Sequence, residues 1–77
     1  MSYKGFSGLI SLLDMLNKEK VHYNIEYMRQ GAILIRACLP GIKLEIEVFE
    51  NDFEFSVFRG DETVETDEDM LRKIIQG

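Results

Sequence analysis

The sequence predicts one α+β domain with the order helix, four or five antiparallel strands in a meander, and helix. Between residues 22 and 65, apolar and polar residues alternate with a period of two, and glycine, proline, asparagine and aspartate interrupt them at short intervals. On either side of this region the apolar residues recur every three or four positions, which is the spacing of a helix with one buried face. One face of the predicted sheet is apolar throughout, so we expect both helices to pack on that face.

The composition is typical of a small globular protein. The chain has 77 residues, of which 45% are hydrophobic, and its single cysteine, Cys38, excludes an intramolecular disulfide. The uncharged apolar runs are far shorter than the roughly 20 residues of a membrane span, and the first residues do not resemble a cleavable leader. We therefore expect a cytoplasmic protein that does not associate with membranes.

The net charge of −5 is unevenly distributed along the chain. Residues 1–31 hold four bases and three acids, whereas residues 32–77 hold five bases and eleven acids. Nucleic-acid binding depends on a basic patch that faces the phosphates, and the sequence has no such cluster. A basic protein partner would suit the acidic half of the chain.

The first helix is predicted over residues 6–20. Ser2 or Ser7 would cap its start, and Lys18 and Lys20 suit its end, where cations face the negative pole of the helix dipole. Its apolar stripe consists of Phe6, Leu9, Ile10, Leu13 and Leu16.

The first strand begins near Tyr23, where the period changes to two. Tyr23, Ile25 and Tyr27 are predicted to face the core, in a strand that is half buried. A three-residue loop that ends in a left-handed Gly31 then places Tyr27 opposite Ile33 in the second strand.

Two further turns extend the meander. A turn at Pro40 and Gly41 is expected to place Ile35 opposite Ile46, because proline presets φ and glycine accepts a positive value. The third strand then covers Ile42 to Phe49.

The next turn is predicted at Asn51 and Asp52, since both residue types tolerate positive φ. It would set Val48 against Phe55 in the fourth strand. All inward residues of the third and fourth strands are then apolar: Leu44, Ile46, Val48, Phe53, Phe55 and Val57.

A short fifth strand, Glu62 to Glu65, is predicted after a turn at Gly60 and Asp61, with Val57 opposite Val64. The closing helix follows. Its expected N-cap is Thr66, and the acids of residues 67–69 occupy the first turn, where the helix dipole favours them. Its apolar stripe consists of Met70, Leu71, Ile74 and Ile75.

The single histidine and the single cysteine form one candidate for a catalytic or metal-binding pair. The predicted register places His22 and Cys38 opposite each other on the outer side of the sheet, away from the helices. Two ligands make a weak metal signal, and no pocket is evident around the pair. We therefore prefer to interpret it as an ordinary cross-strand pair.

The many carboxylates do not form a catalytic pattern either. Glycosidase chemistry needs two carboxyl groups in unlike environments, but Glu45, Glu47 and Glu54 are predicted to be equally solvated. The acids of residues 61–69 lack the ligand spacing and central glycine of an EF-hand loop. We expect no enzyme, no metal and no cofactor.

The outer side of the predicted sheet is the candidate binding surface. It carries Glu45, Glu47 and Glu54 beside Phe49 and Phe58, and aromatic residues surrounded by acids are typical of an interface for a basic partner. Alternatively, the two rings cover the ends of the sheet, or they are shielded by the C-terminal segment or by the first residues, Tyr3 in particular. A homodimer through this face or through an edge strand is a third possibility.

Four short motifs resemble those of a group of small bacterial proteins of unassigned role: HYNIEY at 22–27, RQGAI at 29–33, LPG at 39–41 and KLEIEVFE at 43–50. The resemblance implies a small bacterial α+β domain and no catalytic residues. The chain is also similar in general appearance to immunity proteins, which neutralise toxins.

Our hypothesis from the sequence is a non-catalytic protein-interaction module, of the immunity or antitoxin type, that binds a basic protein. The predicted contacts are Glu45, Glu47, Phe49, Glu54 and Phe58. The alternative is a small homodimeric protein with a structural or regulatory role.

Overall fold

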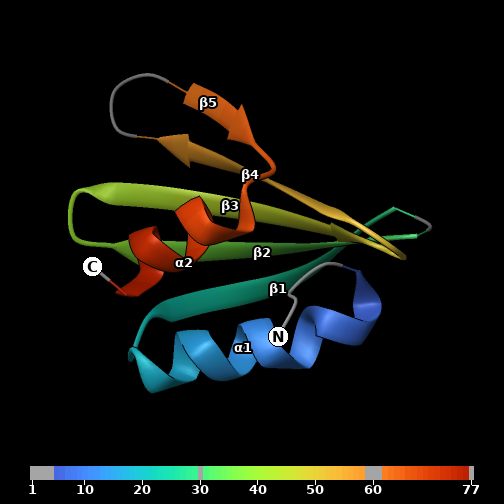
Figure 1. Cartoon of the computed structure of the whole chain (residues 1–77), viewed down its shortest axis with the longest axis horizontal. Helices are drawn as coiled ribbons and strands as arrows, with labels where there is room; N and C mark the ends of the chain where they lie inside the picture. The colour runs from blue at the N-terminus through green and yellow to red at the C-terminus, as the bar shows by residue number, and fades with distance from the viewer. Residues whose placement is uncertain (1–4, 30, 59–61, 77) are drawn as a thin grey trace.

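The structure is a computed structural model that describes residues 5–29, 31–58 and 62–76 (Figure 1). Its five strands form one antiparallel sheet in the order β1-β2-β3-β4-β5, as a meander requires. This confirms the predicted α+β architecture, the fifth strand included. The elements are a 3₁₀ turn (Phe6–Gly8), α1 (Leu9–Lys18), β1 (His22–Arg29), β2 (Ala32–Leu39), β3 (Ile42–Phe49), β4 (Phe53–Phe58), β5 (Glu62–Glu65) and α2 (Glu68–Gln76).

Both helices pack on the same face of the sheet, here called the inner face. A single apolar cluster joins them to the strands, because each element contributes the residues of one side only. The rings of Phe53 and Phe55 stack within it, with centroids 6.0 Å apart. Its members are Leu12, Met15, Leu16, Ile35, Ala37, Leu44, Ile46, Val48, Phe53, Phe55, Val57, Leu71 and Ile75.

The two turns that contain glycine have the predicted registers. Tyr27 lies opposite Ile33, and Ile35 lies opposite Ile46. Gly31 and Gly41 have φ values of 85° and 73°, which only glycine adopts readily. β1 continues one residue further than expected, because a bulge at Met28 lets the strand extend past Tyr27.

The predicted register of β3 and β4 is wrong by two residues. Val48 lies opposite Phe53 and not Phe55, because the tight turn is made by Glu50 and Asn51. The turn is closed by the N–H of Phe49, which donates to the Asp52 carbonyl oxygen at 2.8 Å. A shift of two keeps every side chain on its predicted face, and it brings Phe53 fully into the core.

The predicted register of β4 and β5 is wrong by one residue. Val64 lies opposite Ser56, and Thr63 takes the place opposite Val57. The connection between the two strands spans residues 59–61, one residue more than a two-residue turn provides. The predicted turn residues Gly60 and Asp61 lie outside the described part of the chain.

Helix α1 starts later than predicted, and its buried side differs from the predicted stripe. The N-cap residue is Gly8 and not Ser7, while Ser2 lies outside the described residues. Ile10 is 65% exposed and Phe6 is also exposed. At 100° per residue, Ile10 lies nearly opposite the side formed by the buried residues Leu12, Met15 and Leu16.

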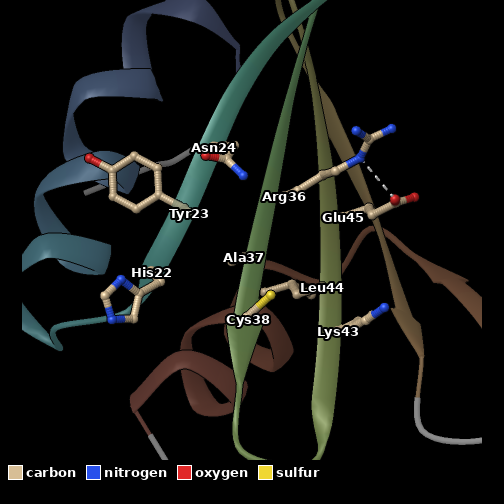
Figure 2. Close-up of a pocket in the computed structure, with 9 residues that line it drawn as sticks. All are labelled: His22, Tyr23, Asn24, Arg36, Ala37, Cys38, Lys43, Leu44 and Glu45. Atoms are coloured by element: carbon tan, nitrogen blue, oxygen red, sulfur yellow. Dashed lines mark hydrogen bonds and ion pairs between the residues drawn. The ribbon is translucent and has the colours of Figure 1, made fainter.

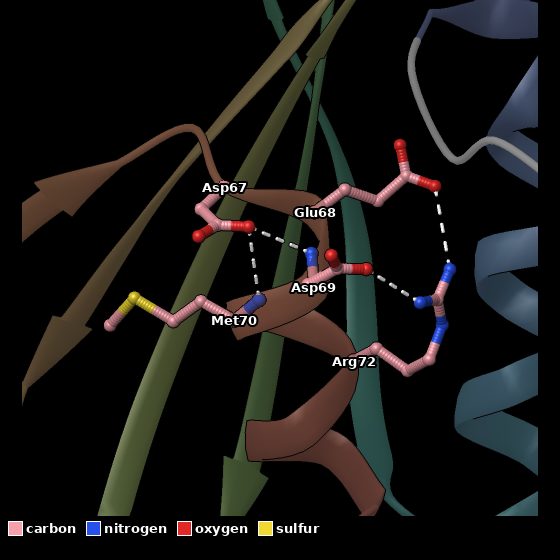
Figure 3. Close-up of polar contacts among 5 residues, drawn as sticks. All are labelled: Asp67, Glu68, Asp69, Met70 and Arg72. Atoms are coloured by element: carbon pink, nitrogen blue, oxygen red, sulfur yellow. Dashed lines mark hydrogen bonds and ion pairs between the residues drawn. The ribbon is translucent and has the colours of Figure 1, made fainter.

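Helix α2 is capped by Asp67 and not by Thr66 (Figure 3). A carboxylate oxygen of Asp67 accepts hydrogen bonds from the N–H groups of Asp69 and Met70, at 2.9 and 3.3 Å. Arg72 reaches back to Asp69 at 2.9 Å and to Glu68 at 3.6 Å. These contacts stabilise the first turn of a helix of only nine residues.

Backbone hydrogen bonds attach the start of α1 to the β3–β4 turn, and a local bond closes its other end just before β1. Before the helix, the N–H of Gly5 donates to Asp52 O at 3.2 Å, and the N–H of Phe6 donates to Glu50 O at 3.1 Å. After the helix, the N–H of Val21 donates to Leu16 O at 2.9 Å. α1 therefore runs from the β3–β4 turn to the start of β1 (Figure 1).

The diagonal path of α1 leaves the second half of β1 uncovered. The hydroxyl of Tyr23 still contacts the helix, donating to Asn17 Oδ1 at 3.1 Å. Further along β1, Ile25 is 52% exposed and Tyr27 is 67% exposed. The prediction that the side of this strand with Tyr23, Ile25 and Tyr27 is buried against the core is therefore wrong for Ile25 and Tyr27.

Replacing Gly5 with alanine is expected to destabilise the protein by at least about 2 kcal/mol, because two costs combine. Gly5 has a φ of 72°, and an added Cβ would overlap the carbonyl oxygen of Glu50 and lie 3.0 Å from Asn51 Cα. Gly41→Ala is the matched control, since its φ is 73° but nothing lies within 4 Å of the added carbon. Urea unfolding of both variants measures the difference, and equal losses would contradict the close approach at Gly5.

Candidate binding surface on the outer sheet face

The outer face is the side of the sheet that points away from both helices. Its residues come from every second position of β1 to β4, as the register requires. They are His22, Asn24, Glu26, Ala32, Leu34, Arg36, Cys38, Lys43, Glu45, Glu47, Phe49, Glu54, Ser56 and Phe58.

Arg36 joins three strands of the outer face through two ion pairs. Its Nη1 lies 3.0 Å from Glu26 Oε1 on β1, and its Nε lies 3.3 Å from Glu45 Oε2 on β3 (Figure 2). Glu45 lies directly opposite Arg36 in the β2–β3 register. Glu26 is a diagonal neighbour of Arg36 across the β1–β2 ladder and is therefore within reach.

Arg29 forms a second connection at the other end of the face. Its guanidinium lies 3.4 Å from Glu47 Oε2, and 5.9 Å from the centre of the Phe49 ring. This contact depends on the bulge at Met28, which places Arg29 opposite Ala32 and turns it to the outer side. Sequence analysis assigned Arg29 to the loop and so could not predict the contact.

Leu34 is buried, although it lies on the outer face. It stands between Glu26 and Glu47 in the register, and only 5% of it is exposed. Both neighbouring glutamates form ion pairs, Glu47 with Arg29 and Glu26 with Arg36. The alternation of side chains along the strand alone would predict that a leucine on the outer face is exposed. Long charged side chains can cover such apolar surface with their aliphatic stems.

The predicted glutamates differ in their pairing. Glu45 and Glu47 each contact an arginine of this chain. Glu54 lies directly opposite Glu47 on the neighbouring strand, and no ion pair of Glu54 is found within the described residues. Two carboxylates that face each other across strands repel, and a cation placed between them would relieve the repulsion.

The two predicted aromatic contacts do not form one cluster. Phe49 is the last residue of β3, whereas Phe58 lies opposite Lys43 near the start of the same strand. Six strand positions separate these points, which corresponds to about 20 Å. Both rings are half buried. Tyr3, the residue considered as a cover for them, lies outside the described residues.

His22 and Cys38 lie opposite each other, as predicted, at the edge of a shallow hollow of about 420 Å³. Figure 2 shows the imidazole of His22 directed away from the Cys38 thiol, which is exposed. The only interaction marked among the nine residues that line the hollow is that of Arg36 with Glu45. Within the described ranges, no group of three His, Cys, Asp or Glu side chains could hold a metal ion.

Comparisons with protein-family models, curated proteins and solved structures found no match to this chain. Of the helices that the structure describes, none is both long enough and apolar enough to cross a membrane.

Replacing Arg36 with glutamine should lower the free energy of unfolding by at most about 1 kcal/mol, because exposed ion pairs contribute little. The loss should shrink in 1 M NaCl, since salt screens the charges. Lys43→Gln is the control, as this exposed cation shares the face and forms no ion pair with the described residues. Equal losses in both variants, or a loss of stability independent of salt, would contradict a specific role for the Arg36 pairs.

Proposed function

We propose that this chain is a non-catalytic protein-interaction module that binds a basic segment of another protein through the outer face. The observation that carries the proposal is the juxtaposition of Glu47 and Glu54 on adjacent strands, with Glu54 lacking a cationic partner among the described residues. The predicted contacts are Glu45, Glu47, Phe49, Glu54 and Phe58.

A lysine or arginine of the partner would lie between Glu47 and Glu54. The side chain of Glu47 is only 20% exposed, so an ion pair there is screened less by water than one at a fully exposed site. The half-buried Phe49 ring adjoins the same position and offers apolar contact to the stem of the incoming residue.

The charge of the outer face is balanced locally, which limits how far it attracts a partner. Glu26, Glu45 and Glu47 face the arginines at 29 and 36, so their charges are largely compensated within the face. The net charge of −5 then steers a basic partner at long range, and the carboxylate of Glu54 provides the local contact.

The type of module is suggested by the resemblance to small bacterial proteins and by the general similarity to immunity proteins. An immunity or antitoxin-type inhibitor presents a preformed acidic surface to a basic toxin, which agrees with the surface described above. We place its action in the cytoplasm of a bacterium, where a reducing environment keeps an exposed thiol such as that of Cys38 reduced.

Glu54→Lys is expected to weaken binding at least tenfold, because it replaces attraction by repulsion at the centre of the site. The partner is first captured from lysate by the wild-type protein and then purified, and its affinity is measured by calorimetry. Glu19→Lys is the matched control, since it makes the same charge change at an exposed position at the end of α1. Added salt should also slow the association of the wild-type protein.

Phe49→Ser and Phe58→Ser are tested separately, because the two rings are far apart. Phe49 is the last residue of β3, whereas Phe58 on β4 lies beside the start of β3. The variant at Phe49 should bind more weakly than the variant at Phe58, since Phe49 adjoins the carboxylate pair. If the partner binds equally well to folded Glu54→Lys and Glu19→Lys, the outer face is not the binding site. Circular dichroism establishes that each variant is folded.

A further inference from the structure

β1 lies at one edge of the sheet and has few of the features that usually prevent an edge strand from pairing with another chain. β1 is eight residues long, and of the strands that the structure describes only β2 lies beside it. Natural edge strands are usually shortened, bulged or charged to prevent pairing with another chain. In β1, the pairing with β2 is regular from His22 to Tyr27, and the bulge comes only at Met28.

The inner side of this edge is apolar and incompletely covered. Ile25 and Tyr27 point to the same side as the helices, yet 52% and 67% of their respective surfaces are exposed. Ile33, opposite Tyr27 on β2, is half buried and continues the apolar corner. A second strand beside β1 would cover the corner that α1 leaves open.

The charge of the chain favours a second copy at this edge. Residues 1–31, which include α1 and β1, hold four bases and three acids, so two copies would meet here with little repulsion. The acidic residues of β5 and of the first turn of α2 lie away from β1, because β5 forms the opposite edge of the sheet. Glu26, the one carboxylate in β1, is already paired with Arg36.

The sequence of β1 is also complementary to itself in one antiparallel register. A two-fold axis at Ile25 places Ile25 opposite its copy and Tyr23 opposite Tyr27 on the inner side. On the outer side, Asn24 then meets Glu26. This register pairs seven residues of each strand, whereas an axis at Glu26 would place two like charges opposite each other.

We propose that two copies of this chain associate through β1, paired antiparallel about a two-fold axis at Ile25, to form one continuous ten-stranded sheet. The contact uses the exposed side chains of Ile25 and Tyr27 and the free backbone edge. It is independent of the outer-face proposal, because it involves a different surface. The contact is small, so we expect a dissociation constant on the order of 10 µM.

Sedimentation equilibrium between about 1 and 300 µM tests the dimer, a range that spans the affinity expected for a small contact. The wild-type protein should sediment as a dimer at the upper end of the range, and Ile25→Lys should remain a monomer, because its ammonium groups would meet across the axis. Ile10→Lys is the control, since it makes the same substitution at an isoleucine on the far side of α1 that is 65% exposed, against 52% for Ile25. It should dimerise like the wild type.

Cross-linking tests the register. Cα atoms that face each other across antiparallel strands lie about 4.5–5.5 Å apart, which is within the range of a disulfide. Ile25→Cys in a Cys38→Ser background should therefore form a covalent dimer on mild oxidation. The corresponding Ile10→Cys variant should not.

Three results would overturn the proposal. The first is a wild-type protein that remains monomeric throughout the concentration range. In that case β1 would contact a different protein or solvent, and not a second copy of the chain. The second is a dimer that survives Ile25→Lys in a protein shown to be folded by circular dichroism. The third is a dimer that is lost in Ile10→Lys and retained in Ile25→Lys.

Discussion

The position of α1 is the constraint on which the surface of this protein depends, and it is set by backbone bonds at the start of the helix and by the short connection to β1 at its end. Gly5 and Phe6 bind the β3–β4 turn, and Val21 closes the helix at the start of β1. The helix of ten residues is about 15 Å long, while β1 with eight residues extends for about 27 Å. A helix of that length, held on a diagonal, cannot cover the whole edge of the sheet.

The small size of the chain also limits how much of the sheet the helices can cover. A domain of this length buries only about 60% of the surface that its unfolded chain exposes, so its helices cover the centre of the sheet and leave a corner open. The central strands accordingly hold the fully buried residues, such as Ile35, Leu44 and Ile46. The apolar side chains of β1 remain at the margin of the core.

The outer face shows how arginines change the properties of an acidic surface. Its carboxylates suggest one negative patch, yet Arg29 and Arg36 form ion pairs with three of them. Exposed pairs of this kind stabilise the fold by little. Among the described residues of the outer face, they leave Glu54 as the carboxylate without a cationic partner.

The sequence predicted those parts of the fold that local chemistry determines. The turns at Gly31 and Gly41 need positive φ, which identifies glycine positions reliably and gave the correct registers. The β3–β4 turn uses ordinary φ values, so it carried no such signal, and the register was wrong while the inward side chains of β4 were right. A register error of two residues leaves every side chain on the same face of the sheet. The alternation of apolar and polar residues along the strand, more than the exact position of this turn, therefore determines which residues enter the core.

Long-range contacts explain what the sequence could not predict at the candidate surfaces. Ile25 is exposed although it lies on the inner side of the sheet, and the backbone bonds that position the start of α1 leave no pattern in the sequence. The two surfaces are nonetheless compatible, since a two-fold axis normal to the sheet keeps both outer faces on one side. A dimer would then present two Glu54 sites on one surface. A basic partner with two matching segments would gain avidity without any new contact, because the second site would bind it at a high effective concentration.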